Sequence, residues 1–381
     1  MVRMLHLCLL LLLIRPSLSA QDRDTARIAL HVPDSIALAP LIYLASDQLQ
    51  GRFIGSPGIQ AAADYIIAGL RASGARPIPG ANGYLQAFTR DFSRHDLYKV
   101  GQSDSRNNMP EHVPFKSFNL QNIIAFIPGT DPILRRQYIM LSAHYDHVGL
   151  ADYSFEVDGK QDSIFNGARD NATGTAAVIA AARYFGKYPP RRSVLLVFFT
   201  AEEEGEFGSA YYAAHPLVPL KSTIFDLNVD NAGYNTTHAI CLFGLGRTNA
   251  DSLIQKACLN YGLAVLAEPP NLDLFNRSDN ANFAKLGVPA PCFSLGMKKW
   301  DDDIDRYYHK RGDEVGNMDL DYVVRFIHAY ILSAQYIAND PARPRWTPND
   351  EFEKAWFSLY DSPVHLNASP QRAVLPPRQH P

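Results

Sequence analysis

Histidine and carboxylate residues in this sequence recur beside short apolar runs. The segments that carry them read His144-Tyr-Asp146-His147, Asn166-Gly-Ala-Arg-Asp170, Thr200-Ala-Glu202-Glu203-Glu204, Asp230-Asn231 and Tyr307-Tyr308-His309. In an open α/β sheet, ligands bind beyond the carboxyl ends of the strands. We therefore expect these segments to bring their His, Asp and Glu side chains to one edge of a sheet.

This combination of imidazole and carboxylate groups predicts a binuclear metal site. Such N and O ligands suit Zn²⁺ and its neighbours Co²⁺ and Mn²⁺. Two ions held about 3.5–4 Å apart need a bridging carboxylate. We assign this role to Asp170, because Gly167 and Gly174 allow the backbone to approach closely around it. Asp146 is placed to accept the second N–H of His144 and so to orient the ring.

Each of these residues, taken singly, has a simpler explanation. A histidine at a strand end is usually a core or surface residue, and Glu202 to Glu204 also read as a solvated acidic corner. The metal-site hypothesis depends on the recurrence of ligand types in several segments.

Composition excludes several other classes of protein. The chain has 381 residues, 46% of them hydrophobic, which is enough to bury one large core or two modest ones. A formal net charge of −3 argues against nucleic-acid and anionic-lipid partners. The four cysteines form no C-x-x-C pair, which argues against a thiolate zinc knuckle and a disulfide-stapled scaffold. A bound metal must therefore be held by His, Asp and Glu.

The two ends of the chain differ from its body. Residues 1–20 combine Arg3, an apolar run of about ten residues and small residues before Gln21, the pattern of a secretory signal peptide. We expect its removal to leave a periplasmic or extracellular protein with no membrane attachment, since no second apolar stretch of membrane length follows. Residues 21–367 are expected to form a single domain, and residues 368–381 a flexible tail.

Alternating apolar runs and helical periodicities predict an α/β fold with a mostly parallel central sheet flanked by helices. Nearly continuous runs of Ile, Val and Phe predict strands at residues 122–127, 138–143, 194–199 and 223–229. Helices are expected at residues 39–50, 59–70, 173–184, 208–214, 251–261 and 320–338. Residues 76–118 read as loops around one or two short strands, and the aromatic residues between 346 and 360 are expected to pack on the body.

The ligand segments belong to a longer series of motifs that is spread over most of the chain. The series reads Leu44-Ala-Ser-Asp-Gln-Leu-Gln-Gly-Arg52, Gly55-Ser-Pro-Gly58, Ala143-His-Tyr-Asp-His-Val-Gly149, Asp170-Asn-Ala-Thr-Gly174, Ala201-Glu-Glu-Glu-Gly205, Gly208-Ser209, Asn228-Val-Asp230 and Tyr308-His309. In this order the sequence resembles the secreted di-zinc aminopeptidases of the bacterial leucyl aminopeptidase and aminopeptidase Y type, within the zinc exopeptidase superfamily. The resemblance implies the three-layer, phosphorylase/hydrolase-like sandwich of that superfamily, without a dimerisation or protease-associated insert.

The resemblance also implies roles for individual residues. The implied ligands are His144, Asp170 and Asp230 for one zinc ion and Asp170, Glu203 and His309 for the other. Glu202 would be the general base for a water molecule that bridges the two ions. Tyr308 would donate to the developing oxyanion, although an aromatic residue packed against the sheet explains it equally well. The peptide after the bridging aspartate, Asp170–Asn171, is expected to be cis.

The implied activity is metal-dependent hydrolysis of peptide bonds at a free N-terminus, with two Zn²⁺ per chain and peptide or protein N-termini as substrates. Two alternatives stay open: a glutaminyl cyclase with a single zinc ion, and a non-catalytic binding ectodomain on the same fold. Asn280 stands where relatives usually have histidine, and residues 301–305 form an acidic loop that either attracts a substrate ammonium group or is simply solvated. The preferred first residue, dipeptidase or amidase activity and the oligomeric state stay undetermined.

Overall fold

Nearly continuous apolar runs form the central strands of the sheet, as the sequence predicts. The computed structural model describes residues 32–79, 81–92, 116–157 and 160–361. Its strands, in chain order, are Leu85–Phe92 (β1), Lys116–Ile127 (β2), Tyr138–His144 (β3), Gly149–Val157 (β4), Lys160–Phe165 (β5), Ser193–Phe199 (β6), Thr223–Val229 (β7), Ala239–Phe243 (β8), Ala264–Ala267 (β9) and Cys292–Leu295 (β10). Strands β2, β3, β6 and β7 contain the four expected runs.

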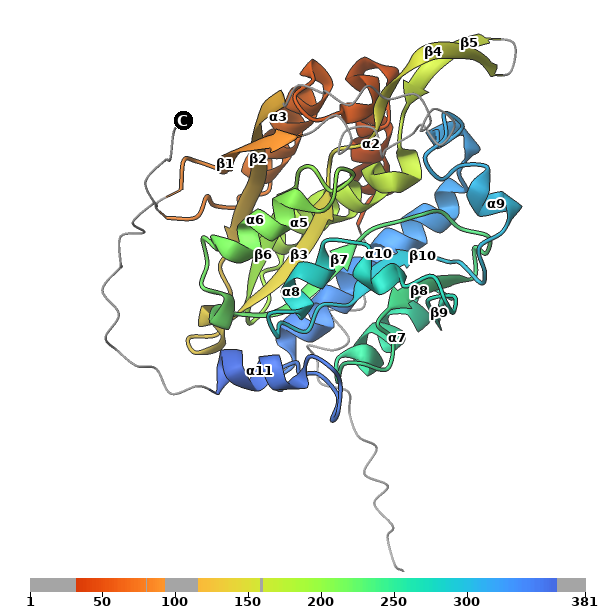
Figure 1. Cartoon of the computed structure of the whole chain (residues 1–381). Coiled ribbons are helices and arrows are strands. Elements are labelled where there is room, and N and C mark those ends of the chain that lie inside the picture. The colour runs from red at the N-terminus through yellow and green to blue at the C-terminus, as the bar shows by residue number, and fades with distance from the viewer. Residues whose placement is uncertain (1–31, 80, 93–115, 158–159, 362–381) are drawn as a thin grey trace, which may run out of the picture.

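The main sheet has the strand order β1-β2-β6-β3-β7-β10-β8-β9 within the described residues (Figure 1). Strands β6, β3, β7 and β10 run parallel, whereas β1 with β2, β2 with β6, and β8 with β10 pair antiparallel. The prediction of a mostly parallel centre is confirmed. Because parallel strands share one orientation, β3, β6 and β7 all end at the same edge of the sheet. Strands β4 and β5 form a separate antiparallel hairpin that projects from the body.

Helices cover both faces of the sheet. The α-helices are Asp34–Leu44 (α2), Pro57–Ala72 (α3), Gly174–Lys187 (α5), Phe207–Ala214 (α6), Asp251–Leu259 (α7), Asn280–Ala284 (α8), Asp302–Asp305 (α9), Leu320–Asn339 (α10) and Glu353–Tyr360 (α11). Helices α2, α3, α5, α7 and α10 share one hydrophobic core, and α6, α8 and α11 pack against a second. Side chains along β6 alternate between the two, with Leu196 in the first core and Leu195 in the second. The fold is the expected three-layer sandwich.

One expected helix is interrupted. Helix α2 ends at Leu44, and a 3₁₀ turn at Asp47–Arg52 replaces the second half of the helix expected at residues 39–50. In this turn Gly51 has φ +70°, and a Cβ there would lie 2.4 Å from the Gly149 carbonyl oxygen. The chain turns because residues 47–52 pack against β4 and β5, a contact that overrides the local helical pattern.

The C-terminal aromatic segment packs on the body with one exception. Trp346 is 2% exposed, and its indole N–H donates to the Gly287 carbonyl over 3.1 Å. On α11, Trp356 packs against the second core. The expectation is wrong for Phe357, which is 50% exposed, because the helical repeat places it about 100° around α11 from Trp356.

Within the described ranges, none of the helices combines the length and the apolar character needed to cross a bilayer. The expected signal segment, residues 1–20, and the expected tail, residues 368–381, lie outside those ranges. Both therefore stay predictions, as does the single domain over residues 21–367.

Gly58 tests how tightly α3 packs on the turn before it. A Cβ at this position would lie 1.7 Å from the Leu49 carbonyl oxygen, so Gly58→Ala must displace backbone. We expect the free energy of unfolding, measured by urea denaturation, to fall by about 1–3 kcal/mol. Gly69→Ala on the same helix is the control, because its Cβ meets only Ile179 at 3.4 Å and alanine favours the helix. Equal effects of the two substitutions would contradict this packing argument.

Candidate metal centre

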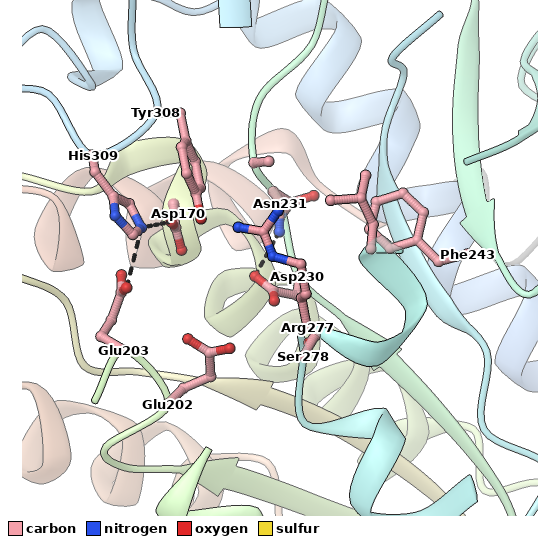
Figure 2. A pocket seen from close by; sticks show the side chains of 12 residues that line it. Asp170, Glu202, Glu203, Asp230, Asn231, Phe243, Arg277, Ser278, Tyr308 and His309 are labelled. Carbon is pink, nitrogen blue, oxygen red and sulfur yellow. Dashed lines mark hydrogen bonds and ion pairs between the residues drawn. The ribbon is translucent and has the colours of Figure 1, made fainter. Parts of the chain in front are cut away.

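The structure brings the five predicted ligand residues to one place. His144 ends β3, Glu203 follows β6, and Asp230 follows β7. Asp170 lies on the turn before α5, and His309 lies in the segment between α9 and α10. Apart from His144, which is buried, these residues line a common pocket (Figure 2).

Asp170 lies between two histidines. Its Oδ1 is 3.3 Å from His144 Nε2, and its Oδ2 is 3.0 Å from His309 Nε2. Asp230 completes the first set, with Oδ1 3.1 Å from His144 Nε2, and Glu203 completes the second, with Oε2 3.1 Å from His309 Nε2. Two sets of ligand atoms therefore share one carboxylate, which is what a binuclear site requires.

The donor atoms fit divalent ions of the zinc type. Ligand atoms of His144, Asp170 and Asp230 all lie within 4.8 Å of one another, and imidazole nitrogens with carboxylate oxygens are zinc ligands. Although burial acts to lower the pKa of His144, Glu202 and Asp230 raise it well above its ordinary value. Burial also acts to lower the pKa of His309, but Glu203 and Asp170 raise it to about 10. The carboxylates thus attract positive charge, which a metal ion would supply in place of protons.

The turn that carries Asp170 is anchored to the end of β7. Gly167 has φ +59°, and a Cβ there would lie 2.3 Å from the Asp170 carbonyl oxygen, so this position needs glycine. The Asp170–Asn171 peptide is cis, as the resemblance implies. Asn171 donates to the Val229 carbonyl over 2.9 Å, and its Oδ1 accepts from Gly174 N over 3.1 Å. These bonds hold Asp170 beside the residue that follows β7.

Asp313 links two of the three segments that carry the second ligand set, those of Asp170 and His309. It is 1% exposed and follows His309 on the same loop. Its Oδ2 accepts from the backbone N–H of Asp170 over 3.2 Å and from that of Arg169 over 3.0 Å, and its Oδ1 accepts from the Arg169 guanidinium over 2.9 Å. The position of His309 is therefore coupled to that of Asp170. The sequence analysis did not single out Asp313, because only the folded chain brings it to this turn.

Arg52 is a second residue whose role emerges only in the structure. It is 1% exposed and donates to the carbonyls of Leu44, Tyr145, Asn166 and Gly167. Burial lowers its pKa to about 10, and nearby carboxylates oppose that shift. Arg52 thus cross-links the loop after β3 to the turn before Asp170.

Asp146 and His147 both contact Glu203. Asp146 Oδ2 accepts from the backbone N–H of Glu203 over 3.3 Å, and His147 Nδ1 lies 2.6 Å from Glu203 Oε1. Asp146 Oδ1 is 3.8 Å from His144 Nδ1, which is longer than a hydrogen bond. Orientation of His144 by Asp146 therefore stays a prediction. The sequence analysis assigned no role to His147, although this residue belongs to the same segment as His144 and Asp146.

The adjacent residues Glu202 and Glu203 experience different electrostatic surroundings. Burial raises the pKa of Glu202 well above its ordinary value, with Asp230 adding to the rise and His144 opposing it. Burial acts in the same direction on Glu203, but His309 and His147 outweigh it and hold the pKa at about 2. A raised pKa suits a proton acceptor, whereas a permanently ionised carboxylate suits a ligand.

Tyr308 directs its hydroxyl into the pocket (Figure 2). Its ring stacks on His309 with centroids 4.0 Å apart and meets Trp300 edge-on at 5.0 Å. Burial raises the pKa of Tyr308 well above its ordinary value, and Asp170 and Glu203 add to the rise. The hydroxyl therefore keeps its proton and is able to donate a hydrogen bond.

Asn280 and the acidic loop are not among the residues that line the pocket. Asn280 is fully buried and donates to the carbonyls of Phe275 and Ala290, each over 3.1 Å, so its amide holds a loop together. In the acidic loop, Asp301 caps α9 by accepting from Asp303 N. Residues 302, 303 and 305 are exposed, which favours the solvated interpretation.

The strand ends, the shared aspartate and the three-layer sandwich define the zinc exopeptidase class of fold and site. Residues 122–333, more than half of the chain, match the model of Peptidase family M28. The chain belongs to that family, and the predicted membership of the zinc exopeptidase superfamily is confirmed.

Solved structures of two kinds of enzyme share the fold. An aminopeptidase from Aneurinibacillus sp. strain AM-1 aligns with a TM-score of 0.60 and 16% identity, covering 86% of this chain and 98% of that one. A glutaminyl cyclase from Porphyromonas gingivalis aligns with a TM-score of 0.54 and 17% identity, covering 81% of this chain and 96% of that one. The fold alone therefore does not select the reaction.

Curated relatives are longer than this chain. Aminopeptidase YwaD from Bacillus subtilis (strain 168) is 23% identical over 202 residues, which are 53% of this chain and 41% of that protein. A vacuolar membrane protease from Schizosaccharomyces japonicus is 27% identical over 165 residues, which are 40% of this chain and 17% of that protein. The chain thus spans less than half the length of these relatives.

Asp313→Asn tests whether Asp313 ties the His309 loop to the Asp170 turn. The amide would place a donor against the Asp170 N–H or the Arg169 guanidinium and leave a buried cation without its partner. We expect the free energy of unfolding of chelator-treated protein to fall by about 3–5 kcal/mol. Asp302→Asn, at an exposed position of α9, should change it by no more than about 0.5 kcal/mol. An Asp313 variant as stable as this control would contradict the anchoring role.

Proposed function

We propose that this protein is an aminopeptidase that hydrolyses the peptide bond next to a free N-terminus with two zinc ions. The proposal rests on Asp170, whose two carboxylate oxygens face His144 and His309. The proposed ligands are His144, Asp170 and Asp230 for one ion and Asp170, Glu203 and His309 for the other. Membership of family M28 and the likeness to aminopeptidases support the assignment.

Glu202 carries the proton transfers in this proposal. Two zinc ions held by these residues would lower the pKa of a water molecule and polarise the scissile carbonyl. Glu202, whose Oε2 lies 3.9 Å from His144 Nε2, takes a proton from the attacking water and returns it to the leaving nitrogen. The water oxygen bonds to the carbonyl carbon while the C=O electron pair moves to the carbonyl oxygen. When that pair returns, the C–N bond breaks, and the protonated nitrogen leaves as a free amine beside a carboxylate.

Tyr308 and Asp146 complete the proposed machinery. The Tyr308 hydroxyl, directed into the pocket, donates to the carbonyl oxygen as negative charge develops on it. Asp146 positions Glu203 by accepting its backbone N–H.

The sequence pattern supports a periplasmic or extracellular place of action. Residues 1–20 have the layout of a signal peptide, and residues 21–367 follow as one proposed domain. The proposed substrates are therefore peptide or protein N-termini in that compartment.

A single-zinc glutaminyl cyclase is the second candidate, because the P. gingivalis enzyme has the same fold. Against it, His144 and Asp230 form a complete ligand set with Asp170, and His309 contacts both Asp170 and Glu203 beside it. Two sets of ligands favour the peptidase.

Glu202→Gln separates catalysis from metal binding. We expect kcat for a leucyl anilide to fall about 10²- to 10⁴-fold, because the amide cannot accept the proton, while the zinc content measured by atomic absorption stays at two ions per chain. Glu203→Gln is the matched neighbour and should lose zinc as well as activity. Wild-type turnover by the Glu202 variant would overturn its assignment as the base.

Metal content and N-terminal blocking distinguish the candidate reactions. We expect two zinc ions per chain, loss of leucyl anilide hydrolysis with a chelator, recovery on adding zinc, and no cleavage of the N-acetylated anilide. One ion per chain together with cyclisation of N-terminal glutamine would establish the cyclase. Equal cleavage of the blocked and free substrates would indicate an endopeptidase or amidase.

A further inference from the structure

Arg277 places a cation in the pocket that the proposed reaction does not use. It lines the pocket with Asp230, Asn231 and Tyr308 (Figure 2). Its side chain is exposed, and its guanidinium has no hydrogen bond or ion pair with any residue that the structure describes. An unpaired guanidinium beside a reaction site is available to a ligand.

The loop that presents Arg277 is held in place on both sides. Asn280 donates to the Phe275 carbonyl and to a backbone carbonyl just before β10, each over 3.1 Å. Ser278 Oγ accepts from Asn228 of β7 over 2.8 Å. Because Asn228 belongs to the strand that leads to the ligand Asp230, the base of the Arg277 side chain is fixed relative to the metal centre.

The charge balance of the pocket favours an anionic group of the substrate. Asp170, Glu202, Glu203 and Asp230 are the carboxylates among the lining residues. Two divalent ions balance their four negative charges, and a metal-bound imidazole is neutral. The Arg277 guanidinium would then be a positive charge that no lining carboxylate balances, and such a charge attracts an anionic group.

We propose that Arg277 is a specificity-determining residue that binds a carboxylate of the substrate. The inference rests on the proposed aminopeptidase function and deepens it by naming the substrate class, which is short peptides or aminoacyl compounds with a carboxylate close to the scissile bond. A guanidinium matches a carboxylate with two parallel N–H donors. Phe243 and Leu274 in the same lining lower the local polarity and so strengthen that pairing.

Two kinds of substrate offer this carboxylate. One is an aminoacyl compound whose first residue is acidic, and the other is a dipeptide, whose C-terminal carboxylate lies one residue beyond the scissile bond. Two isosteric pairs separate them: glutamyl and glutaminyl 4-nitroanilide for the first, and Leu-Gly and Leu-Gly-amide for the second.

The test measures kcat and KM for both pairs and for leucyl 4-nitroanilide, with the zinc-loaded wild type and with Arg277→Gln, Arg277→Lys and Arg306→Gln. Arg306 is the control, because it is an exposed arginine on the segment that leads to Tyr308. Free L-glutamate and L-glutamine are compared as competitive inhibitors of leucyl anilide hydrolysis. Zinc content is measured for every variant.

We expect the wild type to prefer the carboxylate member of one pair, and the pair concerned identifies the source. Arg277→Gln should raise KM for that member about 10- to 100-fold, the effect expected for loss of a charged hydrogen-bonding partner. Its kcat for leucyl anilide and its zinc content should stay within about threefold of the wild type, since uniform binding affects KM alone. Arg277→Lys should be intermediate, and Arg306→Gln should match the wild type.

Three results would overturn the proposal. The first is an equal kcat/KM of the wild type for both members of each pair. The second is an equal loss of kcat/KM on charged and neutral substrates in Arg277→Gln, and the third is the same loss of kcat/KM in Arg306→Gln. In each case hydrolysis of leucyl anilide leaves the proposed function standing. A zinc-loaded wild type inactive on all five substrates would overturn the proposed function and the substrate class together.

Discussion

Several carboxylates are buried within a few ångströms of one another at the end of the sheet, and they need positive charge between them. Isolated buried charges are costly, and like charges that share a site cannot all stay ionised without compensation. Asp170 stands at the centre of this arrangement, between His144 and His309. Its pKa is held well below the ordinary value because these imidazoles outweigh the effect of burial. The rest of the site serves to hold this carboxylate in place.

Support for Asp170 comes from segments that are distant in sequence. Asn171 ties its turn to β7, Asp313 ties the turn to the His309 loop, and Arg52 ties it to the loop after β3. Most of these contacts use backbone groups, which have few ways to move. A site in which reacting groups must be held to within about half an ångström benefits from such rigid anchoring.

The fold occurs in both aminopeptidases and glutaminyl cyclases, so the reaction that such a protein catalyses depends on the side chains at the strand ends. Here two sets of ligand atoms share Asp170, while the neighbouring residues Glu202 and Glu203 have opposite pKa shifts. Arg277 adds a feature of a different kind, because it is a cation among the residues that line the pocket. The proposed metal binding and the proposed substrate choice would therefore depend on different residues of one pocket.

The sequence by itself determined the central strands, and it predicted the ligand residue types and the shared role assigned to Asp170. Apolar runs, polar strand ends and glycine-flanked turns are local patterns, so they can be recognised in the sequence alone. Only the tertiary structure decided the turn at residues 47–52, the exposure of Phe357 and the parts taken by Arg52, Asp313, His147 and Arg277. Each of these depends on which distant backbone or side chain lies opposite, and partners that meet only on folding leave no periodic signal along the chain.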